Sequence, residues 1–243
     1  MNRIVLITGA SQGIGAATAL AFAKEKDTII INYCTSEKLA LELKNKIEYM
    51  GATAMVIQAD ISKEAEVDAM VEKVISTYGR IDVLVNNAGI AIDDEFFDHT
   101  VEHFRKILDI NLVGMFYVSK CVSRHMLENK NGVIINVSSN NGIDCNSPLS
   151  LDYDASKAGV ISLTHNLARA LMPTIRVNAV APGWTNTVSV KEMMPEYLEA
   201  EKKKIMLERF AEPEEIANII FFLASKEASY INDTVIRVDG GIL

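Results

Sequence analysis

Short apolar runs alternate with segments of helical periodicity along most of the chain. The apolar runs are rich in Val and Ile and show little polar alternation, a pattern typical of strands that are covered on both faces. The expected strands span residues 4–7, 28–33, 53–58, 81–85, 133–137, 175–180 and 234–238. This pattern predicts a parallel sheet enclosed between two layers of helices.

The segments between the apolar runs are long enough to form crossover helices. The expected helices span residues 13–25, 36–50, 62–78, 100–128 and 153–171, and one more begins at Pro213. In the second of them, Leu39, Leu43 and Ile47 lie four residues apart and predict one buried stripe. Ser36 and Ser62 are expected to cap the N-terminal ends of their helices.

The order of these elements predicts an α/β fold with one doubly wound, seven-stranded parallel sheet, Rossmann-like, with helices on both faces. The length of 243 residues and the even composition predict a single domain over residues 1–243. No strand is expected between Ala181 and Glu212. Residues 184–212, with Met193 and Met194, are predicted to form either a helical insertion at the surface or a mobile lid over a site at the strand ends.

Composition narrows the function classes. The formal net charge of −8 disfavours a nucleic-acid surface, which needs a basic field. No apolar stretch approaches the roughly 18 residues of a membrane span, and no signal-peptide pattern occurs, so we expect a cytoplasmic protein. The cysteines are far apart and the histidines lack metal-ligand spacing, so neither a disulfide framework nor a metal site is expected.

A glycine-rich turn follows the first expected strand and opens a helix. It reads Thr8-Gly9-Ala10-Ser11-Gln12-Gly13-Ile14-Gly15. Glycines allow a diphosphate to approach the backbone closely, and the helix N-terminus offers free N–H groups and a positive dipole end. No Lys follows the glycines, which disfavours a P-loop nucleotidase. The turn therefore predicts a dinucleotide site that includes Gly9, Ser11, Gln12, Gly13, Ile14 and Gly15.

Tyr153 and Lys157 are four residues apart and share one face of an expected helix. An ammonium near a phenol favours the phenolate, so this pair predicts a general acid for reduction or a general base for oxidation. Ser138 and Ser139 follow the fifth expected strand, at the sheet edge where ligands bind. A hydroxyl there can stabilise negative charge on a substrate oxygen. Without such neighbours, Tyr153 and Lys157 would read as an ordinary surface pair.

The spacing Thr-Gly-x-x-x-Gly-x-Gly, together with Tyr-x-x-x-Lys, resembles the short-chain dehydrogenase/reductase family over the whole chain. Further segments match in order: Asn86-Asn87-Ala88-Gly89, Pro182-Gly183 with Thr187, and Val238-Asp239-Gly240-Gly241. The resemblance implies a nicotinamide-dependent oxidoreductase whose catalytic residues are Ser139, Tyr153, Lys157 and Asn111.

The resemblance also implies roles for single residues. Ser139 is preferred to Ser138 because Gly142 follows it by three positions, although Ser139 lies one residue further from Tyr153 than the family places its serine. Asn111 is expected to bind a water that passes protons to Lys157, with a helix kink or a bonded backbone carbonyl as the alternative. Lys157 is expected to hold the nicotinamide ribose, Asp60 the adenine and Thr187 the carboxamide. The expected cofactor contacts outside the glycine turn are Asn32, Thr35, Ser36, Asp60, Ile61, Asn87, Ala88, Gly89, Tyr153, Lys157, Pro182, Gly183, Thr185 and Thr187.

The identity of the nicotinamide cofactor depends on the end of the second expected strand. Residues 32–36 contain no acid that would bind a ribose 2′-hydroxyl and repel a 2′-phosphate, which favours NADP. NAD stays the alternative, because Gln12 stands where many NADP-preferring relatives carry a basic residue and only Lys38 is near. The hydroxyls of Thr35 and Ser36 would have to hold the phosphate.

Within the family, the pattern is most similar to the 3-oxoacyl-[acyl-carrier-protein] reductases of fatty acid biosynthesis, notably over residues 174–183. An acidic carrier protein needs cations near the site mouth, and residues 128–131 and 172–174 are poor in them. The alternatives are a reductase or dehydrogenase of a small sugar, steroid, ketone or secondary alcohol, or a cofactor-sensing protein without catalysis. The family further implies a homotetramer that uses helices 100–128 and 153–171.

Overall fold

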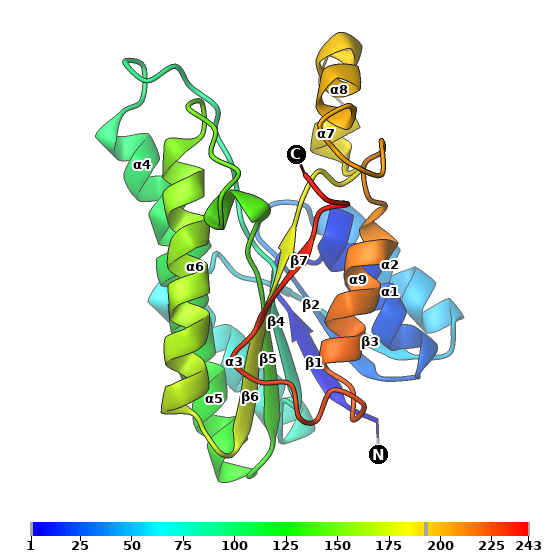
Figure 1. Cartoon of the computed structure of the whole chain (residues 1–243). Helices are drawn as coiled ribbons and strands as arrows, with labels where there is room; N and C mark the ends of the chain where they lie inside the picture. The colour runs from blue at the N-terminus through cyan, green and yellow to red at the C-terminus, as the bar shows by residue number, and fades with distance from the viewer. Residues whose placement is uncertain (1, 192–193, 243) are drawn as a thin grey trace.

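One sheet of seven parallel strands runs through the centre of the computed structural model, which describes residues 2–191 and 194–242 (Figure 1). The strands are β1 (Ile4–Ile7), β2 (Thr28–Tyr33), β3 (Thr53–Gln58), β4 (Val83–Asn86), β5 (Gly132–Val137), β6 (Ile175–Pro182) and β7 (Val235–Val238). Their order across the sheet is β3-β2-β1-β4-β5-β6-β7. The order reverses between β1 and β4, and such a switch point is where open α/β sheets bind ligands.

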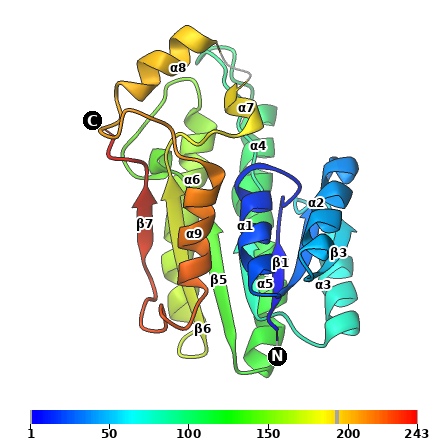
Figure 2. The ribbon, with the colours of Figure 1, turned by 90° about the vertical axis from the view of Figure 1, so that its right-hand side faces the viewer.

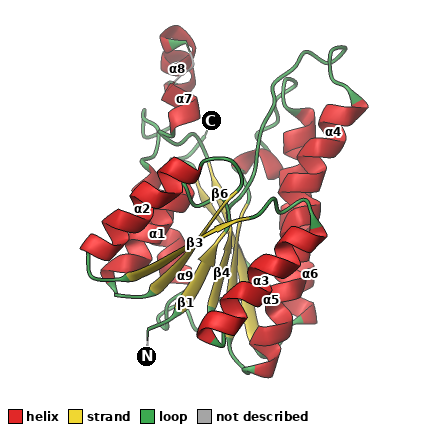
Figure 3. Ribbon diagram, turned by 180° about the vertical axis from the view of Figure 1, so that it is seen from behind, coloured by secondary structure: helices red, strands yellow, loops and turns green. Residues whose placement is uncertain are grey.

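Helices cover both faces of the sheet, as the three views show (Figures 1, 2 and 3). They are α1 (Gly13–Lys24), α2 (Glu37–Tyr49), α3 (Glu64–Tyr78), α4 (Val101–Leu108), α5 (Met115–Glu128), α6 (Leu151–Ala170), α7 (Val188–Lys191), α8 (Pro195–Lys202) and α9 (Pro213–Leu223). Helices α1, α2 and α9 pack on one face, and α3, α5 and α6 on the other. The predicted doubly wound α/β fold is therefore confirmed.

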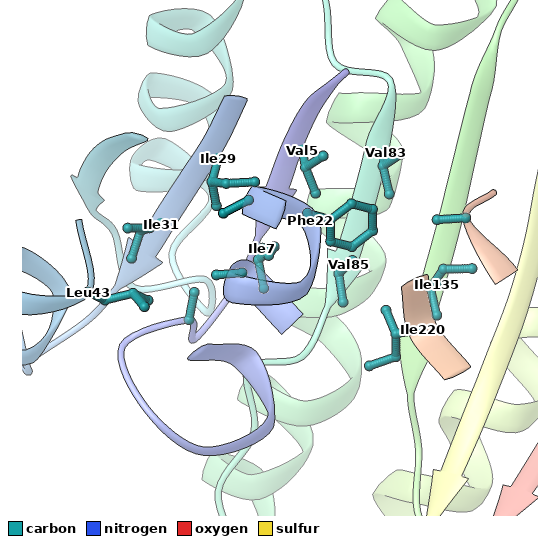
Figure 4. Packing of buried hydrophobic residues seen from close by; sticks show 14 of the residues in the cluster. Val5, Ile7, Phe22, Ile29, Ile31, Leu43, Val83, Val85, Ile135 and Ile220 are labelled. Carbon is teal, nitrogen blue, oxygen red and sulfur yellow. The ribbon is translucent and has the colours of Figure 1, made fainter. Parts of the chain in front are cut away.

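The core owes its stability to strands without polar alternation. Every residue of β1, β2 and β4 is buried, as expected for strands covered on both faces. On the α1 side, the ring of Phe22 lies over β1 and β4 among Val5, Val83 and Val85 (Figure 4). Phe22 also meets Phe221 of α9 edge to face, with ring centres 5.1 Å apart. This packing fixes α1, and with it the turn that precedes α1.

Three local predictions were wrong. Ser62 does not cap α3, because it donates to Asp60 and the helix begins later, at Glu64. Ser36 lies at the cap position of α2 but makes no capping hydrogen bond through its side chain. Leu39 is 39% exposed, and Ala40 takes its place in the buried stripe of α2. The error at Ser62 follows from its local contact with Asp60, and the error at Leu39 from reading α2 without the strands on which it packs.

The expected helix over 100–128 is interrupted. A π-helical turn, η1 (Asp109–Gly114), separates α4 from α5 and contains Asn111. Gly114 is required there, since a Cβ at this position would lie 2.7 Å from the carbonyl oxygen of Ile61. The π-turn thus brings this helix against the end of β3, and π-turns are frequent at functional sites.

Two projections rise beyond the carboxyl edge of the sheet (Figures 1 and 2). One holds α7 and α8, in the segment predicted as an insertion or lid; Met193 lies outside the described residues. Trp184 anchors its base by stacking on Phe210 at 5.5 Å and meeting Tyr197 edge to face at 6.0 Å. The other projection comprises residues 91–100 and α4. Across 2–191 and 194–242, no helix is long and apolar enough to cross a membrane.

Candidate active site

The glycine turn between β1 and α1 is built against the end of β4. Gly9 has φ of +61°, and a Cβ on it would lie 2.8 Å from the Cα of Ala88, so only glycine fits. The hydroxyl oxygen of Thr8 accepts from the backbone N–H groups of Asn87 and Ala88, at 3.0 and 3.1 Å. The Asn87 amide donates in return to the carbonyls of Thr8 and Gly9, both at 3.0 Å. The predicted cofactor residues of β1 and β4 therefore lie together.

The same turn offers a site for a diphosphate. No side chain caps α1, so its first N–H groups are available to an anion, which the positive end of the helix also attracts. Asn32 braces the turn from β2, because its Oδ1 accepts from Gly9 N at 3.2 Å and its Nδ2 donates to Ala59 O at 3.0 Å. Asn32 is buried, so its role in this structure is to shape the turn. The turn fits the diphosphate of a dinucleotide.

The adenosine end is predicted at Asp60, Ile61, Thr35 and Ser36, where β2 and β3 end. Asp60 borders a pocket of about 560 Å³. The sequence interpretation missed four charged residues that line the same pocket although they are far from Asp60 along the chain: Glu102, Arg105 and Lys106 of α4, and Asp109. It also missed Glu37, the first residue of α2, whose carboxylate together with burial raises the pKa of Tyr33.

Pro182 and Gly183 close the site from β6. The hydroxyl of Thr185 donates to the backbone carbonyl of Gly183 at 3.1 Å and therefore points toward its own backbone. The methyl group of Thr187 lies 3.4 Å from the position of a Cβ on Gly13. The segment after β6 therefore reaches over the glycine turn that follows β1, although β4 and β5 lie between these two strands in the sheet.

The structure brings Ser139, Tyr153 and Lys157 together. Ser139 lies two residues after the end of β5, while Tyr153 lies in the first turn of α6 and Lys157 one turn later. Ser139 lies close enough to the Tyr153 hydroxyl to lower the pKa of Tyr153. The Lys157 Nζ lies 5.5 Å from the centre of the Tyr153 ring and donates to Val137 O at 2.9 Å. Ser138 instead points inward and donates to the carbonyl oxygen of Lys157 at 2.8 Å.

Burial controls the acidity of this group. It raises the pKa of Tyr153, which the neighbouring carboxylates of Asp154 and Asp93 also raise, while the bond with Ser139 acts in the opposite direction. Burial lowers the pKa of Lys157 to about 8. Desolvation of the phenolate is the largest influence on the pKa of Tyr153 in this structure, and the acidifying effect of the amine stays a prediction. Tyr153 keeps its proton at neutral pH, as an acid that reduces a carbonyl requires.

Asn111 reaches the site from the π-turn. Its Oδ1 accepts from Ile90 N at 2.8 Å, and its Nδ2 donates to Ile90 O at 2.9 Å and to Ser156 Oγ at 3.1 Å. The alternative interpretation, in which the Asn111 side chain hydrogen-bonds to a backbone carbonyl, thus describes this structure. Asn111 Oδ1 and Lys157 Nζ both lie within 3.4 Å of the point that a Cβ of Gly89 would occupy. The water relay to Lys157 stays a prediction.

A second hydrogen-bonded set, which the sequence interpretation missed, joins the loop of Ser139 to the turn of Tyr153. Asp154 accepts from Asn141 Nδ2 and from Ser147 N, both at 2.7 Å. Ser139 Oγ accepts from Asn141 N at 3.2 Å, within the short 3₁₀ turn Asn140–Gly142. An acid next to Tyr153 in the first turn of a helix was the available signal. This set holds the two hydroxyl groups in register despite the extra residue between Ser139 and Tyr153.

A doubly wound parallel sheet, a glycine turn fit for a diphosphate, and a Ser–Tyr–Lys group at the same edge define a nicotinamide-dependent oxidoreductase. The family model described as "Enoyl-(Acyl carrier protein) reductase" matches residues 9–243. The chain is 41% identical to the 3-oxoacyl-[acyl-carrier-protein] reductase of Thermotoga maritima, over 100% of this chain and 98% of the relative. It is 40% identical to the enzyme of that name from Synechocystis, over 99% and 97%.

Solved structures agree with these relatives. A short-chain type dehydrogenase/reductase from Mycobacterium marinum superimposes with a TM-score of 0.93 at 34% identity, over 98% of this chain and 94% of the other. The 3-oxoacyl-[acyl-carrier protein] reductase of Brucella melitensis gives 0.91 at 33%, over 99% and 91%. The chain belongs to the short-chain dehydrogenase/reductase family and is an NAD(P)-dependent oxidoreductase.

The lowered pKa of Lys157 predicts the pH dependence. An ordinary lysine stays charged up to about pH 10.4, whereas Lys157 loses its proton above about 8, and its positive charge is needed to stabilise a Tyr153 phenolate. We expect kcat/KM for the cofactor in the reducing direction, which reports the free enzyme, to fall as the pH rises through about 8. Lys157→Arg should move this fall to higher pH. A flat profile between about pH 6 and pH 10 would contradict the assignment.

Proposed function

We propose that this chain reduces the 3-keto group of an acyl thioester with NADPH, and that Tyr153 is the proton donor. The observation that carries the proposal is the convergence of the Ser139 and Tyr153 hydroxyl groups with the Lys157 amine, beside a glycine turn fit for a dinucleotide. Two hydroxyl groups that meet in this way can both bind one substrate oxygen. The names of the relatives at about 40% identity supply the substrate class.

The catalytic roles follow from the contacts. The nicotinamide, when bound, supplies the hydride. Ser139 donates a hydrogen bond to the carbonyl oxygen and stabilises the negative charge that develops there, and Tyr153 donates its proton to the same atom. The charged amine of Lys157 stabilises the phenolate that remains. Asn111 holds the backbone of Ile90 beside Lys157 and is the proposed entry for the returning proton.

Reduction of a carbonyl fits these residues better than reduction of a carbon–carbon double bond. The description of the family model mentions an enoyl group. When an enoyl group is reduced, the proton is added to a carbon atom. Two converging hydroxyl groups are arranged to bind an oxygen atom instead. A ketone presents the oxygen that both hydroxyl groups can bind. We therefore assign the chain to carbonyl reduction.

A second candidate substrate is a small ketone, sugar or steroid that no carrier protein delivers. The observation that favours it is the scarcity of cations in the two segments where a carrier protein is expected to dock, residues 128–131 and 172–174. Residues 128–131 hold one lysine, and residues 172–174 present Met172, which is 68% exposed. In the loop after Ser139, the exposed carboxylate of Asp144 is paired with Arg237 at 2.9 Å, so this cation is already engaged. These features offer little attraction to an acidic carrier protein.

Tyr153→Phe tests the function. It removes the transferable proton and keeps the aromatic ring, so turnover of a 3-oxoacyl thioester should fall at least about 100-fold while NADPH affinity is kept. Turnover is followed by the loss of NADPH absorbance, and NADPH affinity by fluorescence titration. Tyr230→Phe is the control, because the Tyr230 side chain is fully exposed. Near-normal turnover by Tyr153→Phe would refute the assignment.

The same assay separates the substrates. If a thioester on the acyl carrier protein is reduced much faster than the same acyl group on pantetheine, the carrier protein docks. Equal rates on the two thioesters, or faster reduction of a small ketone, favour the second candidate. Consumption of a 2-enoyl thioester instead of any ketone would contradict carbonyl reduction.

For the cofactor we propose NADP in preference to NAD, held at the glycine turn, by Asn87 to Gly89 and by the segment after β6. The 2′-phosphate would lie at Thr35 and Ser36. NADPH should bind at least about tenfold more tightly than NADH. Ser36→Asp should lower NADPH affinity by about tenfold through charge repulsion and leave NADH affinity unchanged. Ser76→Asp, on the exposed side of α3, is the matched control. Tighter binding of NADH by wild type would overturn the proposal.

We also propose a homotetramer. Apolar side chains on η1, α5 and α6 form a groove that includes Leu112, Phe116 and Leu163, and Phe116 is 42% exposed. A second copy of the chain would cover this surface, because exposed apolar grooves of this kind mark interaction sites. Light scattering should give four times the chain mass of 26.7 kDa. Phe116→Asp should yield smaller particles, and Tyr49→Asp should not, since Tyr49 is exposed on α2. A monomer mass for wild type would contradict the tetramer.

A further inference from the structure

A buried histidine and a buried aspartate face each other beside Tyr153, and the mechanism above does not use them. His99 ends the segment between β4 and α4, and Asp152 lies in the first turn of α6. Their side chains are 6% and 0% exposed. His99 Nδ1 and Asp152 Oδ2 are 3.8 Å apart, just beyond the hydrogen-bond range of about 2.7 to 3.2 Å.

The His99 ring and the Asp152 carboxylate each lack a hydrogen bond that the other could supply. Among the described residues, neither ring nitrogen of His99 has a hydrogen-bond partner, and the same holds for Asp152 Oδ2. Buried polar groups are normally paired, and a buried carboxylate oxygen in particular requires a donor. A shift of about 1 Å would bring Nδ1 and Oδ2 into contact. Catalytic hydrogen bonds are often long in ligand-free enzymes and tighten when substrate binds.

Asp152 connects this pair to the phenol. Its other oxygen, Oδ1, accepts from the backbone N–H of Tyr153 at 2.8 Å. The segment that carries His99 is attached to the same region, since Asp94 N donates to Leu149 O at 2.9 Å. Movement of His99 toward Asp152 therefore acts on the turn of α6 from which the Tyr153 side chain extends.

We propose that His99 is a positioning residue for Tyr153, and that its ring N–H donates to Asp152 Oδ2 in the enzyme–cofactor–substrate complex. This bond draws residues 91–99 against α6 and fixes the backbone of Tyr153 from one side. Asp154 fixes the same turn from the other side through Asn141 and Ser147. The inference rests on the role of Tyr153 as proton donor proposed above.

The proposed bond does not depend on the charge of the imidazole. The ionisable groups that face the pair are Asp93 and Asp94 on the same segment, Asp154 on α6, and His103 on α4, which bonds to Asp94 at 3.0 Å. A neutral imidazole also carries one N–H, so the proposed bond needs only the right tautomer. The test therefore uses replacements that keep or remove the donor, and it does not depend on the charge.

The experiment is a double-mutant cycle between His99 and Tyr153 in the full-length protein. His99→Leu should lower kcat at least about tenfold, because small misplacement of a catalytic group is costly, and leave NADPH affinity unchanged. His99→Asn, whose amide N–H takes the place of Nδ1, should restore kcat to within about threefold of wild type. In a Tyr153→Phe background, His99→Leu should cause no further loss, because both changes act through the same hydroxyl.

His165→Leu is the control, since it removes another His–Asp contact, with Asp233, far along α6 from Tyr153. Unchanged kcat in His99→Leu, or an equal loss in the Tyr153→Phe background, would overturn the inference. If His99→Leu does not fold, His99→Ala takes its place in the same cycle. Normal turnover by Tyr153→Phe alone would instead refute the proposed function, so the two failures are distinguishable.

Discussion

A reciprocal pair of hydrogen bonds between β5 and α6 holds the candidate site together. The Lys157 amine donates to the carbonyl of Val137, and the hydroxyl of Ser138 donates to the carbonyl of Lys157. Because Ser139 follows Ser138 just beyond the end of β5, this contact places its hydroxyl near Tyr153, which lies one turn before Lys157. Each buried bond of this kind contributes about 1 to 3 kcal/mol. The geometry of the hydroxyl groups thus depends on contacts made by their neighbours.

The same contact explains why the Tyr153 phenol keeps its proton and why the Lys157 amine loses its proton more easily than an ordinary lysine. Packing α6 against β5 removes water from both groups, and desolvation disfavours the charged form of each, which raises the pKa of Tyr153 and lowers that of Lys157 to about 8. A well-packed interior would not contain such groups for stability alone. These buried ionisable groups lie at the carboxyl edge of the sheet, beside a turn that admits a diphosphate. This position indicates a catalytic site.

The sequence predicted the parts of the fold that local patterns determine. β1 and β2 begin and end where their apolar runs do, since a strand buried on both faces leaves a continuous signal, and the bounds of the edge strand β3 also agree. The error at Leu39 arose where tertiary packing decides which residue faces inward, whereas Ser62 is taken up by a local bond to Asp60. The π-turn around Asn111 has no local signal, because it depends on close contact between Gly114 and Ile61. The direction of the Tyr153 pKa shift likewise required knowledge of burial.

The first turn of α6 shows why motif residues are easier to find than the residues that hold them. Tyr153 and Lys157 are recognisable from their spacing, but Asp152 and Asp154, on either side of the tyrosine, read in the sequence as ordinary acids at a helix start. Their partners, His99 and Asn141, come from segments after β4 and β5 that meet only in the folded chain. Two carboxylates beside the positive end of the helix can each bind a different loop. A short turn can therefore align a phenol with groups from two neighbouring strands.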